Sequence, residues 1–170
     1  GDRRWRIFVG WAETEGEVTS VGFGDSAAWH PSRDLIAFHG CDATGNGCGL
    51  WRMDSGGGNS GTLTSNPADI TPAWSPDGQT VVFTSNDRHG NYEAYALNTA
   101  TREITRLTDH PANDGAPAVS PDGGWVAFLS DRRGRWQIWA VPISGGEAVA
   151  LAEIEGDIGN WLDQQIQWVN

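Results

Sequence analysis

A repeat with a period of 45 residues constrains the fold of this chain more than any other feature. The central copy, TPAWSPDGQTVVF, occupies residues 71–83, and related copies occupy residues 26–38 and 116–128. A period of this size indicates repeated supersecondary units, each of which buries its apolar face only against the next unit.

Each copy holds a tight turn between two β-prone segments. In the turn Ser75–Gly78, proline presets φ, aspartate can bond its own backbone, and glycine can take a positive φ. Residues 120–123 repeat this turn, and residues 30–34 are a degenerate copy that has lost the glycine. The pattern predicts an antiparallel hairpin in every repeat.

Two further strands follow each hairpin. Third strands are expected at Gly49–Met53, Glu93–Leu97 and Gln137–Val141, and fourth strands at Gly61–Thr64, Glu103–Thr108 and Glu147–Leu151. Four short antiparallel strands per repeat are typical of a propeller blade. We therefore predict an all-β fold, a β-propeller of four-stranded antiparallel blades.

The pattern P-A-W-S-P-D-G-x-x-V-x-F, followed by S-N-D-R-x-G, resembles the WD-like propeller repeat of TolB-like proteins, and the resemblance covers about residues 25–152. It implies a β-propeller. It leaves the function open, because this repeat occurs in binding modules, sensor tails and the non-catalytic domains of some peptidases.

About four blades can be counted. A partial blade is expected in residues 1–24, full blades in about residues 25–67, 68–112 and 113–153, and a terminal inner strand in residues 163–170. The chain could close as a small ring, belong to a larger propeller, or combine with a second copy. We favour part of a larger propeller or assembly, since an open arc exposes apolar faces. A start at Gly1 without methionine also suggests processing or excision from a longer protein.

Composition excludes several classes of partner. The net charge of −11 argues against nucleic acid as a partner, because nucleic acid binding needs clustered cations. No apolar run is long enough for membrane insertion.

Cys41 and Cys48 flank the loop between the second and third strands of one repeat, which favours a disulfide over a metal site or free thiols. A disulfide would indicate a secreted protein, extracellular or periplasmic.

No catalytic constellation is visible. The segment Gly57–Gly61 fails the G-x-S-x-G spacing of a serine hydrolase, and none of the 4 histidines has a partner at helical spacing for a metal. We therefore expect neither a cofactor nor a metal.

Two sets of residues remain as candidate sites. Asp69, Asp114 and Asp163 each head an expected inner strand, where they could form a ligand or cation site at the channel mouth or fix blade against blade. Tyr92, Trp125 and Trp136 could form an interaction surface or pack between blades. Trp29, Trp74 and Val119 are expected in the core between blades.

The leading hypothesis is a non-enzymatic propeller module for protein–protein binding or structural assembly, whose partner is another protein or another copy of itself. The alternatives are a non-catalytic propeller domain of a larger hydrolase and a ligand or cation sensor.

Overall fold

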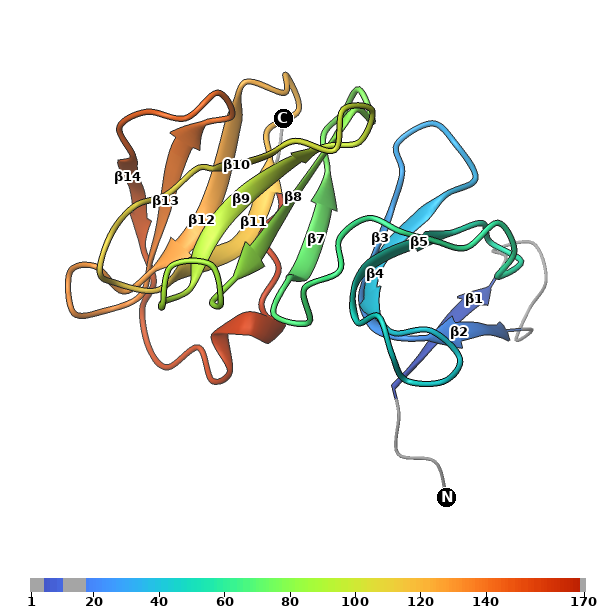
Figure 1. Ribbon diagram of the computed structural model, residues 1–170. Helices are drawn as coiled ribbons and strands as arrows, with labels where there is room; N and C mark the ends of the chain where they lie inside the picture. Colours follow the sequence, from blue (N-terminus) through green and yellow to red (C-terminus); the bar gives the residue numbers. More distant parts are fainter. Residues whose placement is uncertain (1–4, 11–17, 169–170) are drawn as a thin grey trace.

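The computed structural model describes residues 5–10 and 18–168, which form three four-stranded antiparallel sheets and one two-stranded sheet (Figure 1). In every sheet the strands lie side by side in chain order. Such four-stranded meanders are the blades of a β-propeller, so the fold class predicted by the repeat is confirmed.

The strand bounds follow the repeat. The two-stranded sheet contains β1 (Arg6–Gly10) and β2 (Val18–Phe23). The second sheet contains β3 (Asp25–Trp29), β4 (Ile36–Gly40), β5 (Gly49–Met53) and β6 (Gly61–Thr62). The third contains β7 (Ile70–Trp74), β8 (Thr80–Ser85), β9 (Glu93–Asn98) and β10 (Ile104–Arg106). The fourth contains β11 (Asp114–Val119), β12 (Trp125–Ser130), β13 (Gln137–Pro142) and β14 (Val149–Glu153).

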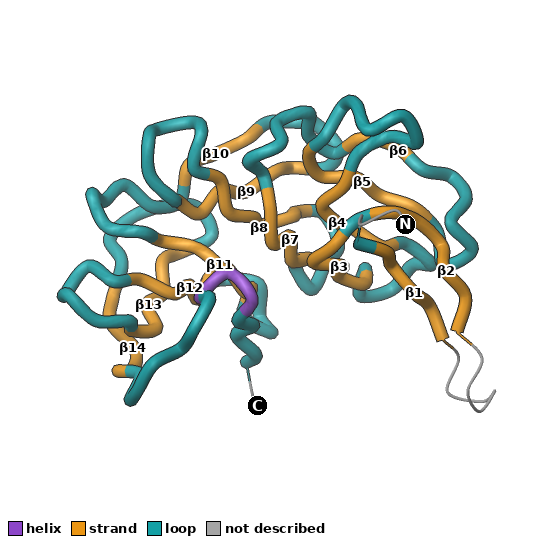
Figure 2. The backbone as a smooth tube through the Cα atoms, turned by 90° about the horizontal axis from the view of Figure 1, so that it is seen from below, coloured by secondary structure: helices purple, strands orange, loops and turns teal. Residues whose placement is uncertain are grey.

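The sheets follow one another along an arc, with β1–β2 at one end and β11–β14 at the other (Figure 2). The core lies between sheets. Each buried cluster joins two neighbouring sheets, and the one between the last two sheets contains Ala94 of β9 and Phe128 of β12. A fully buried aromatic ring such as that of Phe128 contributes about 2–3 kcal/mol. The hydrophobic effect therefore stabilises pairs of neighbouring sheets rather than isolated ones.

Every innermost strand of the four-stranded sheets contains a β-bulge at the same repeat position. A non-glycine residue takes a positive φ there: Ser26 at 52°, Thr71 at 50° and Ala116 at 50°. A left-handed conformation costs a non-glycine residue about 1–2 kcal/mol, so surrounding packing must hold it. A bulge also strengthens the local twist of a strand.

The turn at Ser75–Gly78 joins two sheets as well as two strands. The Oγ of Ser75 donates to Oδ1 of Asp77 at 2.6 Å, and Gly78 has a φ of +68°. A Cβ on Gly78 would lie 2.1 Å from Nε2 of His30 in the preceding sheet. Glycine is therefore required both by the backbone conformation and by the close approach.

The prediction of an inner strand over residues 163–170 is wrong for residues 163–168, the part of this segment that the structure describes. Asp163 ends a 3-10 helix, η1 (Trp161–Asp163), and residues 164–168 form no strand. A strand needs a hydrogen-bonded neighbour, and the described chain offers this segment no second strand. Nevertheless, Nε1 of Trp168 donates to the carbonyl oxygen of Ala118 at 3.1 Å, which holds the segment beside β11.

Candidate functional site

The β1 end of the arc exposes large apolar side chains. We call this region the open end and define it by Trp5, Phe8, Ala27 and Trp29. Trp5 is 77% exposed, Phe8 57% and Trp29 54%. Large exposed apolar side chains are candidates for contact with another polypeptide.

The exposure of Trp29 contradicts its expected place in the core. Trp74 occupies the same repeat position and is half-buried, with its Nε1 donating to the carbonyl oxygen of Ala28 at 3.2 Å. The indole of Trp74 in β7 thus reaches back to the preceding inner strand, β3. Residues 5–10 and 18–168 contain no inner strand before β3, so Trp29 has nothing to cover it.

One edge of β1 is also unpaired. Within the described residues, β1 pairs only with β2, whereas β5, β9 and β13 each pair on both sides. Ile7 and Val9 of β1 are buried against the β3–β6 sheet, and Phe8 points to the opposite face. An unpaired strand edge offers free backbone N–H and C=O groups to another strand.

The aspartates at the heads of β7 and β11 are buried ion pairs. Asp69 is fully buried and bound by two nitrogens of Arg88, from Nη2 to Oδ2 at 2.6 Å and from Nε to Oδ1 at 3.2 Å. Asp114 is also fully buried, and Nη2 of Arg132 donates to its Oδ2 at 2.6 Å. In both cases the arginine comes from the loop after the second strand of the same sheet.

Sequence analysis missed these arginines, although each follows its aspartate at nearly the same spacing in an Asp-Arg dipeptide. Arg132 also lies over the ring of Trp139, 4.4 Å from the centroid, and this cation–π contact further fixes its guanidinium.

One oxygen of Asp114 lacks a partner. Its Oδ1 is buried without a hydrogen bond among the described residues. Burial raises the pKa of Asp114 to about 6, against the lowering effects of the hydrogen bond from Ser130 and the charge of Arg132. Desolvation therefore outweighs the ion pair at this carboxyl.

Asp163 is placed differently from Asp69 and Asp114. It lies exposed in η1, where Nδ2 of Asn160 donates to its Oδ2 at 2.8 Å. The described residues contain no group of three histidine, cysteine, aspartate or glutamate side chains able to hold a metal ion. Since arginines already balance Asp69 and Asp114, the arrangement argues against the cation site considered for these three aspartates.

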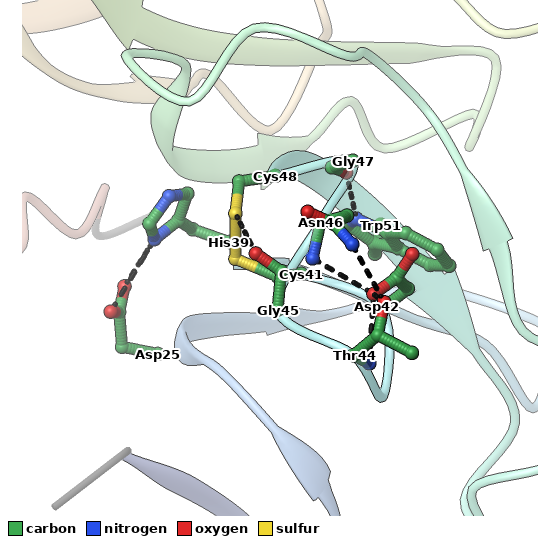
Figure 3. The surroundings of a disulfide bond; sticks show 10 residues. All are labelled: Asp25, His39, Cys41, Asp42, Thr44, Gly45, Asn46, Gly47, Cys48 and Trp51. Carbon is green, nitrogen blue, oxygen red and sulfur yellow. Dashed lines mark hydrogen bonds and ion pairs between the residues drawn. A yellow bond between two sulfur atoms is a disulfide. The ribbon is translucent and has the colours of Figure 1, made fainter.

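Cys41 and Cys48 form a disulfide that closes the loop between β4 and β5 (Figure 3). Asp42 organises the loop by accepting from the backbone N–H of Thr44 and of Asn46, each at 2.9 Å, and from Oγ1 of Thr44 at 2.6 Å. The Thr44 hydroxyl and the Asn46 amide lower the pKa of Asp42. The disulfide and these hydrogen bonds together constrain an exposed loop.

Two of the three aromatic residues considered as an interaction surface contact η1. The ring of Trp136 stacks on Trp161 with centroids 4.8 Å apart, and Tyr92 meets Trp161 edge-on at 5.2 Å. Trp125 lies apart at the start of β12 and is 39% exposed. Trp161 was missed because it falls in a connection that does not repeat.

A polar cleft of about 620 Å³ lies between the β7–β10 and β11–β14 sheets, lined by both Ser-Pro-Asp-Gly turns. Its carboxylates Asp77 and Asp122 already accept hydrogen bonds from the serines of their own turns, Ser75 and Ser120. These hydrogen bonds stabilise the turns through Oδ1 of each aspartate, and a third carboxylate, Glu103, also lines the cleft.

The histidines have structural partners. Nδ1 of His30 accepts from the backbone N–H of Ser32 and of Arg33, each at 3.1 Å. Nδ1 of His39 lies 3.3 Å from Oδ1 of Asp25, and Nδ1 of His89 lies 2.7 Å from the Tyr95 hydroxyl.

For the part of the chain that the structure describes, no helix is long and apolar enough to cross a membrane.

The blades, their repeat and the buried aspartate–arginine pairs define a propeller module. Residues 26–160 match the family described as the TolB beta propeller domain, and the chain belongs to this family.

Individual relatives are longer proteins. An uncharacterised Agrobacterium fabrum protein is 30% identical over 113 residues, which are 66% of this chain and 38% of that protein. The uncharacterised peptidase YuxL of Bacillus subtilis is 29% identical over 154 residues, covering 69% of this chain and 23% of the peptidase. The crystal structure of TolB from Acinetobacter baumannii superposes with a TM-score of 0.67 at 26% identity, covering 80% of this chain and 35% of that one. The chain thus spans less than two fifths of each.

Proposed function

We propose that this chain is a non-enzymatic propeller module for protein–protein binding or structural assembly. The open end carries the proposal, because Phe8 and Trp29 are more than half exposed beside an unpaired strand edge. Apolar surface of this kind is stabilised by contact with another protein. The acidic net charge of −11 disfavours nucleic acid as the partner.

The Cys41–Cys48 disulfide supports an extracellular or periplasmic location for the module. Disulfides persist in oxidising compartments and are rare in the cytosol.

A second candidate function is the non-catalytic propeller domain of a larger hydrolase. The similarity to a Bacillus subtilis peptidase, of which the matched part is 23%, favours this candidate. The mass of the native gene product separates the two, because a hydrolase requires a further domain with a nucleophile. If the native protein contains such a domain and has peptidase activity, the role as a hydrolase domain replaces the leading proposal.

Site-specific photo-crosslinking in the host cell tests the binding role. A photoreactive residue at position 8 of the open end is compared with one at the exposed Gln79. We expect a discrete crosslinked protein from position 8 and none from position 79. Equal products from both positions, or none from either, would contradict the proposal.

A further inference from the structure

The loop that the disulfide closes contains a reactive pair of residues that the proposed function does not use. Asn46 is followed by Gly47, and no other asparagine of the chain precedes a glycine. Both residues are exposed. Asparagine is among the heat-labile residues of proteins, and glycine has no side chain to keep its backbone nitrogen away from the neighbouring side-chain amide. The amide of Asn46 is therefore the one in this chain that is most open to attack from its own backbone.

The backbone nitrogen of Gly47 is not engaged in the fold. No described residue accepts a hydrogen bond from its N–H, although the carbonyl oxygen of Gly47 accepts from Nε1 of Trp51 at 3.0 Å. Because Gly47 is exposed, water and hydroxide reach this nitrogen. Attack by the nitrogen therefore breaks no hydrogen bond that holds the loop.

The side chain of Asn46, by contrast, is held in place (Figure 3). Its Nδ2 donates to Oγ1 of Thr44 at 2.9 Å, and its backbone N–H donates to Oδ1 of Asp42 at 2.9 Å. The Thr44 hydroxyl in turn donates to the same oxygen of Asp42 at 2.6 Å. The side chain must leave Thr44 to turn toward the nitrogen of Gly47, so the hydrogen bond to Thr44 slows the reaction of the pair.

We propose that Asn46 is a site of spontaneous deamidation whose rate is restrained by Thr44. Hydroxide removes the proton of the Gly47 nitrogen, which attacks Cγ of Asn46. The new N–Cγ bond closes a succinimide ring, and the Cγ–Nδ2 bond breaks as Nδ2 takes a proton from water and leaves as ammonia. A water molecule then opens the ring at Cγ to give aspartate, or at the backbone carbonyl carbon to give isoaspartate. This inference goes beyond the binding role and does not depend on it.

Either product changes the loop that Asp42 organises. The amide donor to Thr44 is lost, and a second carboxylate appears beside that of Asp42, where like charges repel. Isoaspartate also adds a carbon to the backbone inside the ring that the disulfide closes. Deamidation therefore converts an ordered exposed loop into a more acidic and less constrained one.

Peptide mapping by mass spectrometry tests the site, after incubation of the intact oxidised chain for several weeks in warm buffer at neutral pH. We expect the peptide with Asn46 to change from amide to acid as a mixture of aspartate and isoaspartate. Asn59 is the matched internal control: it is also exposed, and its Nδ2 donates to Asp54, but serine follows it. Asn59 should remain an amide over the same period. A sample unfolded in urea shows that the assay detects the reaction.

Two variants test the restraint. Thr44→Val removes the hydroxyl that holds the Asn46 amide, so the rate of deamidation should rise about fivefold, as expected for the loss of one hydrogen bond. Thr44→Ser keeps a hydroxyl and should react at the rate of the wild type. Equal rates in the two variants would overturn the role of Thr44. The site itself is overturned if Asn46 reacts only in urea, if Asn59 reacts as fast, or if aspartate forms without isoaspartate.

Discussion

At the scale of single residues, buried charge sets how this fold responds to pH. Asp114 is fully buried, and one of its oxygens has no partner among the described residues. Its carboxyl, with a pKa of about 6, keeps a proton in the folded chain that the unfolded chain releases near pH 4. The folded state therefore binds more protons across this window, and the contribution of Asp114 to stability falls as the pH rises.

We predict that Asp114→Asn removes this dependence. Between pH 4 and 7 the wild type should lose about 2–3 kcal/mol of unfolding free energy relative to the variant, from a pKa difference of about 2. Urea unfolding across the pH range measures the difference between the two curves. Asp163→Asn, at an exposed aspartate, should follow the wild type. Parallel curves for wild type and Asp114→Asn would show that Asp114 does not titrate in this window.

The indole hydrogen bonds between sheets give a second prediction. Trp74→Phe keeps an aromatic ring but removes the donor to the Ala28 carbonyl, so the unfolding free energy should fall by about 1 kcal/mol. Trp29→Phe should change it by less than about 0.5 kcal/mol, because the Trp29 indole bonds no described residue. Equal losses in both variants would mean that the ring, rather than its N–H, is what matters at this position.

At the scale of elements, the Cys41–Cys48 loop is the one covalently closed connection among the described residues. We expect the double variant Cys41→Ser, Cys48→Ser to lose up to about 2–3 kcal/mol, since the crosslink restricts the unfolded chain. Urea unfolding of the variant, beside reduced wild type, measures the loss. Reduced wild type should behave like the variant, and an unchanged midpoint in both would show that the hydrogen bonds of Asp42 suffice to hold the loop.

Strands and turns that recur every 45 residues could be predicted, because the same apolar and turn-forming residues occupy the same positions in each copy of the repeat. The turn at Ser75–Gly78 and the strands β7, β8 and β9 follow from this signal. The C-terminal connection could not be predicted, because η1 and its Trp161 contacts occur once and carry no period. The bulges at Ser26, Thr71 and Ala116 also escaped, because these residues differ from the glycine that usually marks a positive φ.

The candidate site was harder to predict than the fold. The sequence around Trp29 resembles the sequence around Trp74, so the repeat predicts the same burial for both side chains. Trp29 is more exposed because the described chain has no inner strand before β3 to cover it. The aspartates were recognised as special, but their role depends on Arg88 and Arg132, which the strand pattern does not identify as partners.

At the scale of the whole molecule, stability should vary from sheet to sheet. The β7–β10 sheet has a neighbour on both faces, and its strands β8 and β9 are almost wholly buried. By contrast, β2 has no fully buried residue. We predict that amide hydrogen exchange is slowest in β8–β9 and fastest in β1–β2, because local opening follows local burial. Uniform exchange across all sheets would indicate that the chain unfolds only as one cooperative unit.

The tryptophan hydrogen bonds between inner segments all run in one direction, so the two ends of the arc differ. Every such indole donates toward the N-terminus, so one end of the arc offers a donor, Trp29, while the other ends in the backbone carbonyl before Trp168. Two donor ends cannot satisfy each other, and neither can two acceptor ends. A contact of this kind therefore joins unlike faces only, which makes the sheets follow one another in a single direction along the arc.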